Sequence, residues 1–207
     1  LHPAIGPHLH SAALTVCPNG DLLWVAFSCP AGFREHGSET VMVISRLRFG
    51  AEQWDMPALF YDLPDLNDQA SLLWNDNGKI WLFAGGRHFQ NVPFRYCFST
   101  DNGVTWSPLK VPLITGEVGG LTPQPISSAF RGRNNSIYFA CDGTGPSSFL
   151  WCSEDDGKTW HDTGGRTAGR HSAIVQLKDG RLLAMGGKSS DIDGYMPKCY
   201  SSDGGKT

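Results

Sequence analysis

The segment Ser99-Thr-Asp-Asn-Gly-Val-Thr-Trp106 decides the fold, because it recurs as Ser153-Glu-Asp-Asp-Gly-Lys-Thr-Trp160 and as Ser201-Ser-Asp-Gly-Gly-Lys-Thr207. The equivalent aspartates of the three copies are 54 and 48 residues apart. A repeat of about 50 residues is typical of modular architectures such as propellers. The third copy stops one residue before the expected tryptophan, so we expect this chain to be part of a longer one.

A degenerate copy of the motif precedes the other three. The segment from Phe49 to Trp54 ends in a tryptophan that lies 52 residues before Trp106. Because this spacing matches the repeat, the sequence predicts four units in all.

The motif has a physical role that its residue types explain. An aspartate side chain accepts hydrogen bonds from the backbone that follows it, glycine supplies a positive φ, and the tryptophan packs under the turn. We therefore expect the motif residues to be structural. They are Ser99, Asp101, Gly103 and Trp106 in one copy, Ser153, Asp155, Gly157 and Trp160 in the next, and Ser201, Asp203 and Gly205 in the last.

Each motif follows a hairpin and a third strand. Asn19-Gly20, Asn77-Gly78 and Asp179-Gly180 separate apolar, strand-length segments, and such dipeptides are strong hairpin signals. With one strand after the motif, each unit forms a four-stranded antiparallel sheet, the blade of an all-β propeller. The expected ring has six or seven blades, of which four are present, at about 8–60, 61–115, 116–165 and 166–207.

Composition excludes several classes of function. Seventeen Lys and Arg against 20 Asp and Glu give a net charge of -3 and no basic stripe for nucleic acid. Apolar runs such as Ile80 to Ala84 fall far short of the roughly 20 residues of a membrane span. The six cysteines contain no CxxC pair, and we expect buried free thiols. A secreted or periplasmic setting is the favoured localisation, with the question of a signal peptide left open.

Candidate functional residues lie where a propeller builds its binding face, at the entry to each innermost strand and in each loop between the second and third strands. Histidines and arginines gather in these places, and they suit an anionic sugar, since guanidinium binds carboxylates and imidazole transfers protons. Entry positions are His8, His10, Asp68, Gln69, Gln124, Arg170 and His171. Loop positions are Arg34, Glu35, His36, Arg87, His88, Asp142, Lys188, Asp191 and Asp193.

The repeats resemble the Asp-box, or BNR, repeat of the sialidase superfamily over essentially the whole chain. The resemblance implies a β-propeller that hydrolyses acidic, sialic acid-type glycans, with its arginines on the sugar carboxylate and its Asp-boxes at the rim. Among the entry and loop positions, we expect Glu35, His36, His88 and Asp191 to be catalytic, and His10, Arg34, Arg87, Arg170 and His171 to bind substrate. The first arginine of the superfamily is replaced here, where the sequence reads Pro7-His8-Leu9-His10.

Two alternatives follow from the missing arginine and the histidine-rich face. One is a polysaccharide lyase acting on uronate-containing glycans, with an arginine on the carboxylate and His or Tyr as base. Its candidates are His36, His88, Arg87 and Tyr96. The other is a non-catalytic glycan-binding propeller. No His-x-x-x-His or Cys/His spacing indicates a metal, and we expect neither metal nor cofactor.

Overall fold

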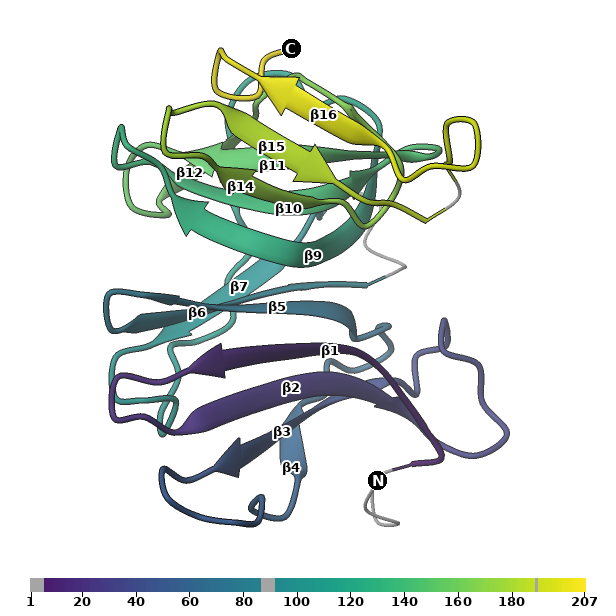
Figure 1. The fold of residues 1–207 in the computed structure, drawn as a ribbon. Helices are drawn as coiled ribbons and strands as arrows, with labels where there is room; N and C mark the ends of the chain where they lie inside the picture. The colour runs from purple at the N-terminus through teal and green to yellow at the C-terminus, as the bar shows by residue number, and fades with distance from the viewer. Residues whose placement is uncertain (1–5, 87–91, 189) are drawn as a thin grey trace. The chain divides into compact units, whose positions relative to one another are not determined.

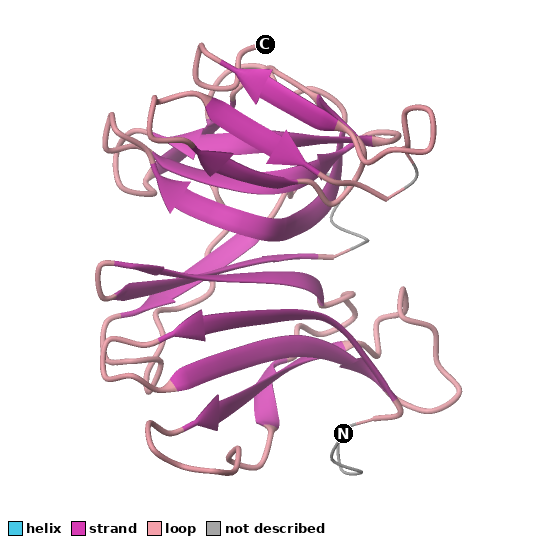
Figure 2. Ribbon diagram, viewed as in Figure 1, coloured by secondary structure: helices cyan, strands magenta, loops and turns pink. Residues whose placement is uncertain are grey.

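The computed structural model describes residues 6–86, 92–188 and 190–207, which form sixteen β-strands joined by turns and loops, without a helix (Figure 2). Accordingly, the described residues hold no helix of the length and apolarity that a membrane crossing would need. The chain divides into two compact units, Leu1–Val111 and Pro112–Thr207, each of which is described by itself.

Unit 1 contains two antiparallel sheets (Figure 1). The first follows chain order, with β1 (His8–Val16), β2 (Leu22–Cys29), β3 (Val41–Leu47) and β4 (Ala58–Tyr61). The second contains β5 (Gln69–Asp76), β6 (Lys79–Gly85) and β7 (Arg95–Ser99). Strand β6 is buried from Ile80 to Gly85, as its unbroken apolar run predicts for a central strand. Apolar side chains of both sheets, among them Phe27, Met42 and Leu82, form one core.

Unit 2 also contains two sheets. The larger has the spatial order β8-β12-β11-β10-β9, and β13 also pairs with β11. Its strands are β8 (Leu113–Ile114), β9 (Leu121–Arg131), β10 (Ile137–Gly143), β11 (Ser147–Ser153), β12 (Thr159–Asp162) and β13 (Thr167–Ala168). The smaller sheet contains β14 (Ala173–Gln176), β15 (Leu182–Met185) and β16 (Lys198–Ser201). Leu150, Ile174 and Leu182 belong to a core that both sheets share.

The predicted all-β fold of antiparallel sheets is confirmed, with one parallel pair, β8 with β12, and so are the predicted hairpins. The Asn77-Gly78 turn joins β5 to β6 with Asp76 opposite Lys79. The six cysteines are free, and five of them are buried. Burial raises the pKa of Cys97 and of Cys141 to about 12, so these thiols stay protonated and inert at neutral pH.

The repeated motif folds into the same hydrogen-bonded turn in each of its three copies. In the second copy, Thr159 donates to both carboxylate oxygens of Asp155, from its backbone N–H at 2.9 Å and from its hydroxyl at 2.7 Å. The hydroxyl of Ser153 accepts the N–H of Gly157 at 2.8 Å. Asp101 and Asp203 accept equivalent pairs of bonds from Thr105 and Thr207.

The degenerate first copy occupies the matching place, between β3 and β4, but lacks this staple. Its Trp54 is 44% exposed, whereas Trp160 is fully buried. A carboxylate from outside the segment binds its backbone instead: Asp21 of the β1–β2 turn accepts the N–H of Phe49 at 2.8 Å. Asp21 also pairs with Arg46 at 2.8 Å. The degenerate copy therefore keeps its place in the repeat but has no buried tryptophan anchor.

The staples predict how stability depends on acid. Hydrogen bonds from Thr105 lower the pKa of Asp101 to about 2. Burial raises the pKa of Asp155, but the bonds from Thr159 outweigh it and leave the pKa at about 2. The pKa of an aspartate in an unfolded chain is about 4. A carboxylate with a lowered folded-state pKa stabilises the fold above about pH 4, and that stabilisation is lost as the pH falls toward about 2.

We therefore expect the urea midpoint of unfolding to fall between about pH 4 and about pH 2, and to fall less steeply in the Asp155→Asn variant. The control is Asp65→Asn, which removes an exposed carboxyl outside the motifs. Equal pH slopes for the wild type and Asp155→Asn would show that the staple carboxylates do not govern acid unfolding.

Candidate functional site

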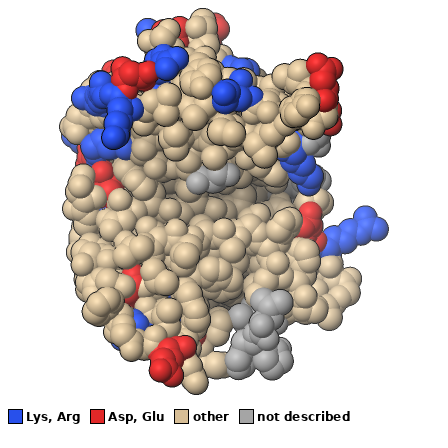
Figure 3. All heavy atoms as spheres, viewed as in Figure 1, with Lys and Arg blue, Asp and Glu red and all other residues tan. Residues whose placement is uncertain are grey.

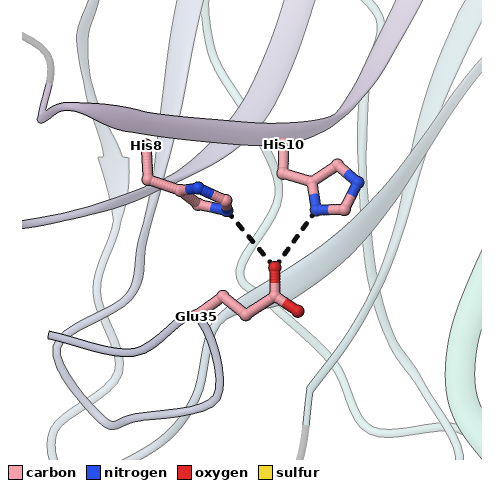
Figure 4. Close-up of side chains that lie close together, drawn as sticks. All are labelled: His8, His10 and Glu35. Atoms are coloured by element: carbon pink, nitrogen blue, oxygen red, sulfur yellow. Dashed lines mark hydrogen bonds and ion pairs between the residues drawn. The ribbon is translucent and has the colours of Figure 1, made fainter.

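A carboxylate meets three histidines at one end of the first sheet. His8 and His10 extend from β1 toward Glu35, which lies in the loop between β2 and β3 (Figure 4). The Oε2 atom of Glu35 is 3.3 Å from His8 Nε2 and 3.2 Å from His10 Nδ1. The Oε1 atom is 3.2 Å from His36 Nε2. The structure thus brings together four residues of the predicted entry and loop positions.

The first strand and a buried asparagine set this geometry. His8 and His10 are two residues apart on β1, so their side chains lie on the same face. Their rings contact Phe27 of β2 at centroid distances of 5.8 and 5.6 Å. Asn67, which is fully buried, donates to the carbonyls of Glu35 at 3.0 Å and Gly37 at 2.8 Å. Asn67 thereby fixes the backbone of the loop that carries the carboxylate.

Glu35 is set up as an anion. Burial raises the pKa of its carboxyl. The hydrogen bond from His10 and the charges of His36 and His10 lower the pKa by more than burial raises it, so it lies below its ordinary value. The group is therefore ionised at neutral pH. An ionised carboxylate can accept a proton or bind a cation, but it does not serve as a general acid at that pH.

A second cluster, in unit 2, is built on the buried carboxylate of Asp142 at the end of β10. Arg170 donates to Asp142 Oδ2 from Nε at 2.9 Å and from Nη2 at 2.8 Å. Nη2 of Arg170 also donates to the side-chain oxygen of Gln124 on β9. The backbone N–H of His171 donates to Asp142 Oδ1 at 2.8 Å, and His171 Nδ1 lies 3.0 Å from Oδ2.

This second cluster fixes a cation beside an oriented imidazole. Burial raises the pKa of Asp142, but the bonds from His171 and Arg170 outweigh it, so the pKa is lowered and the group is ionised. An ionised carboxylate only accepts hydrogen bonds, so Nδ1 of His171 carries the proton and Nε2 of the neutral ring is left as the acceptor. The side chains of Arg170 and His171 remain 29% and 37% exposed. A ligand can therefore reach both.

A left-handed residue directly follows a candidate residue at the entry to three of the four sheets. Ser11, Ala70 and His171 have φ of 49°, 55° and 59°, and they follow His10, Gln69 and Arg170. The pairing of β1 and of β5 shifts register at these points. Positive φ is unfavourable for residues other than glycine, by roughly 1–2 kcal/mol. Such strain often clusters at functional sites, and here it lies at or directly after three of the predicted site residues.

The other predicted site residues have less defined roles. Arg34 is exposed beside Glu35, and Asp191 lies in the exposed loop between β15 and β16, where it accepts the N–H of Gly194 at 3.2 Å. Arg87 and His88 lie outside the described residues. The two clusters belong to different units, so their convergence on one depression stays a prediction.

Tyr96 is a correction to the lyase hypothesis. It is only 6% exposed on β7, and its ring packs against Trp81 and Phe83 of β6. A phenol in this position belongs to the core and does not face a substrate.

Two buried polar residues escaped the sequence reasoning. Asn67 was not among the candidates, although it positions the Glu35 loop. Arg95 lies on β7 and pairs with Asp68 at 2.7 Å, and both side chains are almost fully buried. The available signal was the polar run Asn67-Asp68-Gln69 just before an apolar strand, because buried polar groups need partners.

Repeated stapled turns on an all-β scaffold define a class of protein, and comparisons identify the family. The BNR repeat-like domain family matches residues 20–207, so the chain belongs to this family. No curated protein matches the sequence. The resemblance that the repeats suggested is thereby confirmed.

Solved structures share the fold at low sequence identity. A Hadza microbial sialidase, Hz136, is 15% identical with a TM-score of 0.72, over 99% of this chain and 46% of its own. A variant of the NanB sialidase from Streptococcus pneumoniae is 12% identical with a TM-score of 0.74, over 98% and 51%. The Trypanosoma rangeli sialidase with bound difluorosialic acid is 14% identical with a TM-score of 0.67, over 98% and 37%. The chain thus spans about half or less of each of these proteins, and the likeness shows a sialidase-type β-propeller fold.

Proposed function

We propose that the protein acts on acidic glycans as a sialidase-like glycoside hydrolase. The observation that supports this most directly is Arg170, whose guanidinium is fixed by Asp142 and Gln124 yet stays open to solvent beside His171. A rigid guanidinium loses little freedom when it binds a carboxylate, which makes it suited to the carboxylate of an acidic sugar. The sialidase-type fold agrees with this choice of ligand.

The remaining predicted residues take roles that agree with their surroundings. Glu35 is the proposed base, because it is ionised, and His36 beside it is the proposed proton donor. His10 and Arg34 flank Glu35 and are proposed to contact the sugar. Arg87, His88 and Asp191 keep the substrate-binding and catalytic roles that the sequence suggests. We assign the nucleophile to no residue of this chain.

A specific observation favours a second candidate, a lyase acting on uronate-containing glycans. Asp142 holds both Arg170 and His171, so a carboxylate-binding cation lies beside an imidazole whose Nε2 can accept a proton. A lyase needs this combination, since the cation stabilises the enolate that forms when the base removes the proton next to the carboxylate. The two candidates differ in product, because only elimination yields an unsaturated, ultraviolet-absorbing uronate.

The experiment compares Arg170→Ala with the wild type on acidic and neutral glycans of equal length. We expect Arg170→Ala to weaken binding or turnover of the acidic glycan by about 1.5–3 kcal/mol, the range for a hydrogen bond to a charged group, with little change for the neutral one. The control is Arg181→Ala, which removes an exposed arginine that pairs with Asp179 at 2.8 Å and lies over the ring of Tyr200.

Product analysis distinguishes the hydrolase from the lyase, and a stability measurement distinguishes lost binding from lost folding. Release of free sialic acid would support the hydrolase, and new ultraviolet absorbance with polyuronate would support the lyase. Thermal melting separates a loss of binding from a loss of folding, because Arg170→Ala removes a partner of the buried Asp142. Equal losses on acidic and neutral glycans would rule out carboxylate recognition by Arg170.

A further inference from the structure

We infer that His8, His10 and Glu35 form a binding site for a divalent transition-metal ion, with Zn²⁺ as the best fit. Each residue offers one ligand atom, and the three atoms lie within 4.8 Å of one another. No spacing motif predicts this site, because the histidines are two residues apart and the carboxylate is 25 residues away from His10. The inference concerns metal binding alone and does not depend on the proposed function.

The distances match the coordination sphere of zinc. Zinc bonds imidazole nitrogen and carboxylate oxygen at about 2.0–2.2 Å, so two ligands of a tetrahedral ion lie about 3.3 Å apart. His8 Nε2 and His10 Nδ1 are 3.3 and 3.2 Å from Glu35 Oε2. An ion can therefore replace the hydrogen-bonding protons between these atoms with small side-chain rotations. Two imidazoles and one carboxylate favour zinc over calcium or magnesium, which prefer oxygen.

The surrounding residues orient the carboxylate for this role. The side chain of Gln69 lies 3.3 Å from His36 Nδ1. The ionised carboxylate of Glu35 only accepts hydrogen bonds, so Nε2 of His36 donates to Glu35 Oε1 at 3.2 Å. This bond holds Oε1 and leaves Oε2 directed at His8 and His10 (Figure 4). Such outer contacts typically orient metal ligands in proteins.

Solvent can reach the site. The side chains of His8, His10 and Glu35 are 47%, 60% and 33% exposed. Three protein ligands leave at least one coordination position for water, which is the arrangement of open zinc sites.

A second group with ligand-type side chains, Cys152, Glu154 and His161, fits poorly by comparison. Cys152 is 2% exposed, and burial raises the pKa of its thiol, whereas zinc binds the thiolate. His161 therefore serves as a control histidine, on the other unit.

The test is a Zn²⁺ titration of the untagged, metal-free protein by calorimetry, with Co²⁺ absorbance as a spectroscopic readout. We expect one Zn²⁺ per chain at the site, and Co²⁺ bands that indicate nitrogen and oxygen ligands. Removal of an outer contact typically weakens metal binding about 10–100-fold, so loss of a ligand in Glu35→Gln or His10→Ala should weaken it by at least about 100-fold.

The controls are matched to the changes. Glu39→Gln removes an exposed carboxylate near the same loop, and His161→Ala removes a histidine elsewhere, and both should bind Zn²⁺ as the wild type does. The inference is overturned by a wild type that takes up no stoichiometric Zn²⁺. It is also overturned by unchanged affinity in the folded His8→Ala/His10→Ala double variant.

Discussion

Replacing Trp160 by alanine is expected to lower the free energy of unfolding of unit 2 by about 3–5 kcal/mol, the range for deleting a large buried aromatic. Trp160 is fully buried under its stapled turn, and its indole N–H donates to the carbonyl of Gly157 at 3.2 Å. Its ring packs edge-on against Phe139 at a centroid distance of 5.3 Å. The alanine variant loses this packing and leaves a cavity beside the turn. Urea unfolding followed by tryptophan fluorescence and circular dichroism measures the loss.

The other motif tryptophans form a graded control series. Trp106 is half-buried and contacts Phe60 edge-on at 5.1 Å, so Trp106→Ala should cost less than Trp160→Ala. Trp54 is 44% exposed in the copy without a staple, so Trp54→Ala should cost roughly 1 kcal/mol or less. Equal losses in all three variants would show that the burial of the tryptophan does not determine how much it stabilises the fold.

Removing Arg95 is expected to destabilise unit 1 by about 3–5 kcal/mol, because it leaves a buried carboxylate without its counter-charge. Arg95 Nη1 lies 2.7 Å from Asp68 Oδ1, and its Nη2 donates to the carbonyl of Gly85. Asp68 also accepts the N–H of Leu63 at 2.7 Å. The pair therefore links β7 to the segment that enters β5. Urea unfolding of Arg95→Ala at neutral pH measures the effect.

Charge and pH separate this effect from lost packing. Burial raises the pKa of Asp68 even with Arg95 present, and removing the arginine raises it further. A group with a raised folded-state pKa favours folding most below its unfolded pKa of about 4, and this contribution is lost as the pH rises through the folded pKa. The loss of unfolding free energy in Arg95→Ala should thus be smaller at about pH 4 than at about pH 7. A pH-independent deficit would indicate lost packing alone.

Exposed pairs provide the comparison for Arg95. Arg48 pairs with Asp55 at 2.9 Å, and both side chains are largely exposed to water. Arg48→Ala should therefore cost no more than about 1 kcal/mol, as surface ion pairs do. Loss of several kcal/mol in this control would show that the method overstates the effect of removing an arginine.

Local signals explain why the fold was predictable from the sequence. Turn dipeptides, apolar runs and the stapled motif each act over a few residues, so the hairpin of β5 and β6 and the turn at Asp155 follow from the local sequence. The degenerate first copy is held by a non-local contact, since Asp21 from a preceding turn binds that segment in place of a staple. Tyr96 was misplaced because a strand position alone does not show which side chains face a core.

The candidate site was predictable as a set of positions but not as a set of contacts. Strand entries and loops pointed to His10, Glu35, Arg170 and His171. Their partners come from distant parts of the chain, since Gln124 lies 46 residues from Arg170 and Asn67 lies 32 residues from Glu35. Long-range hydrogen bonds of this kind leave no periodic pattern in the sequence. They also decide which groups are ionised, as at Glu35 and Asp142.

On the face that Figure 3 shows, acidic and basic side chains of the described residues lie in small groups. We therefore expect the proposed recognition of an anionic ligand to depend on individual cations that the fold holds in place, such as Arg170.

The left-handed residues Ser11, Ala70 and His171 affect how such a protein can evolve. Each lies at or just before the start of a first strand's regular pairing, and the register of β1 and of β5 shifts directly after His10 and Gln69, so the strand beyond the shift keeps its own alternation. Mutation can then exchange a histidine, a glutamine or an arginine at this point without disturbing the core-facing register. Duplicated blades can thereby diverge in specificity while the scaffold that carries them stays constant.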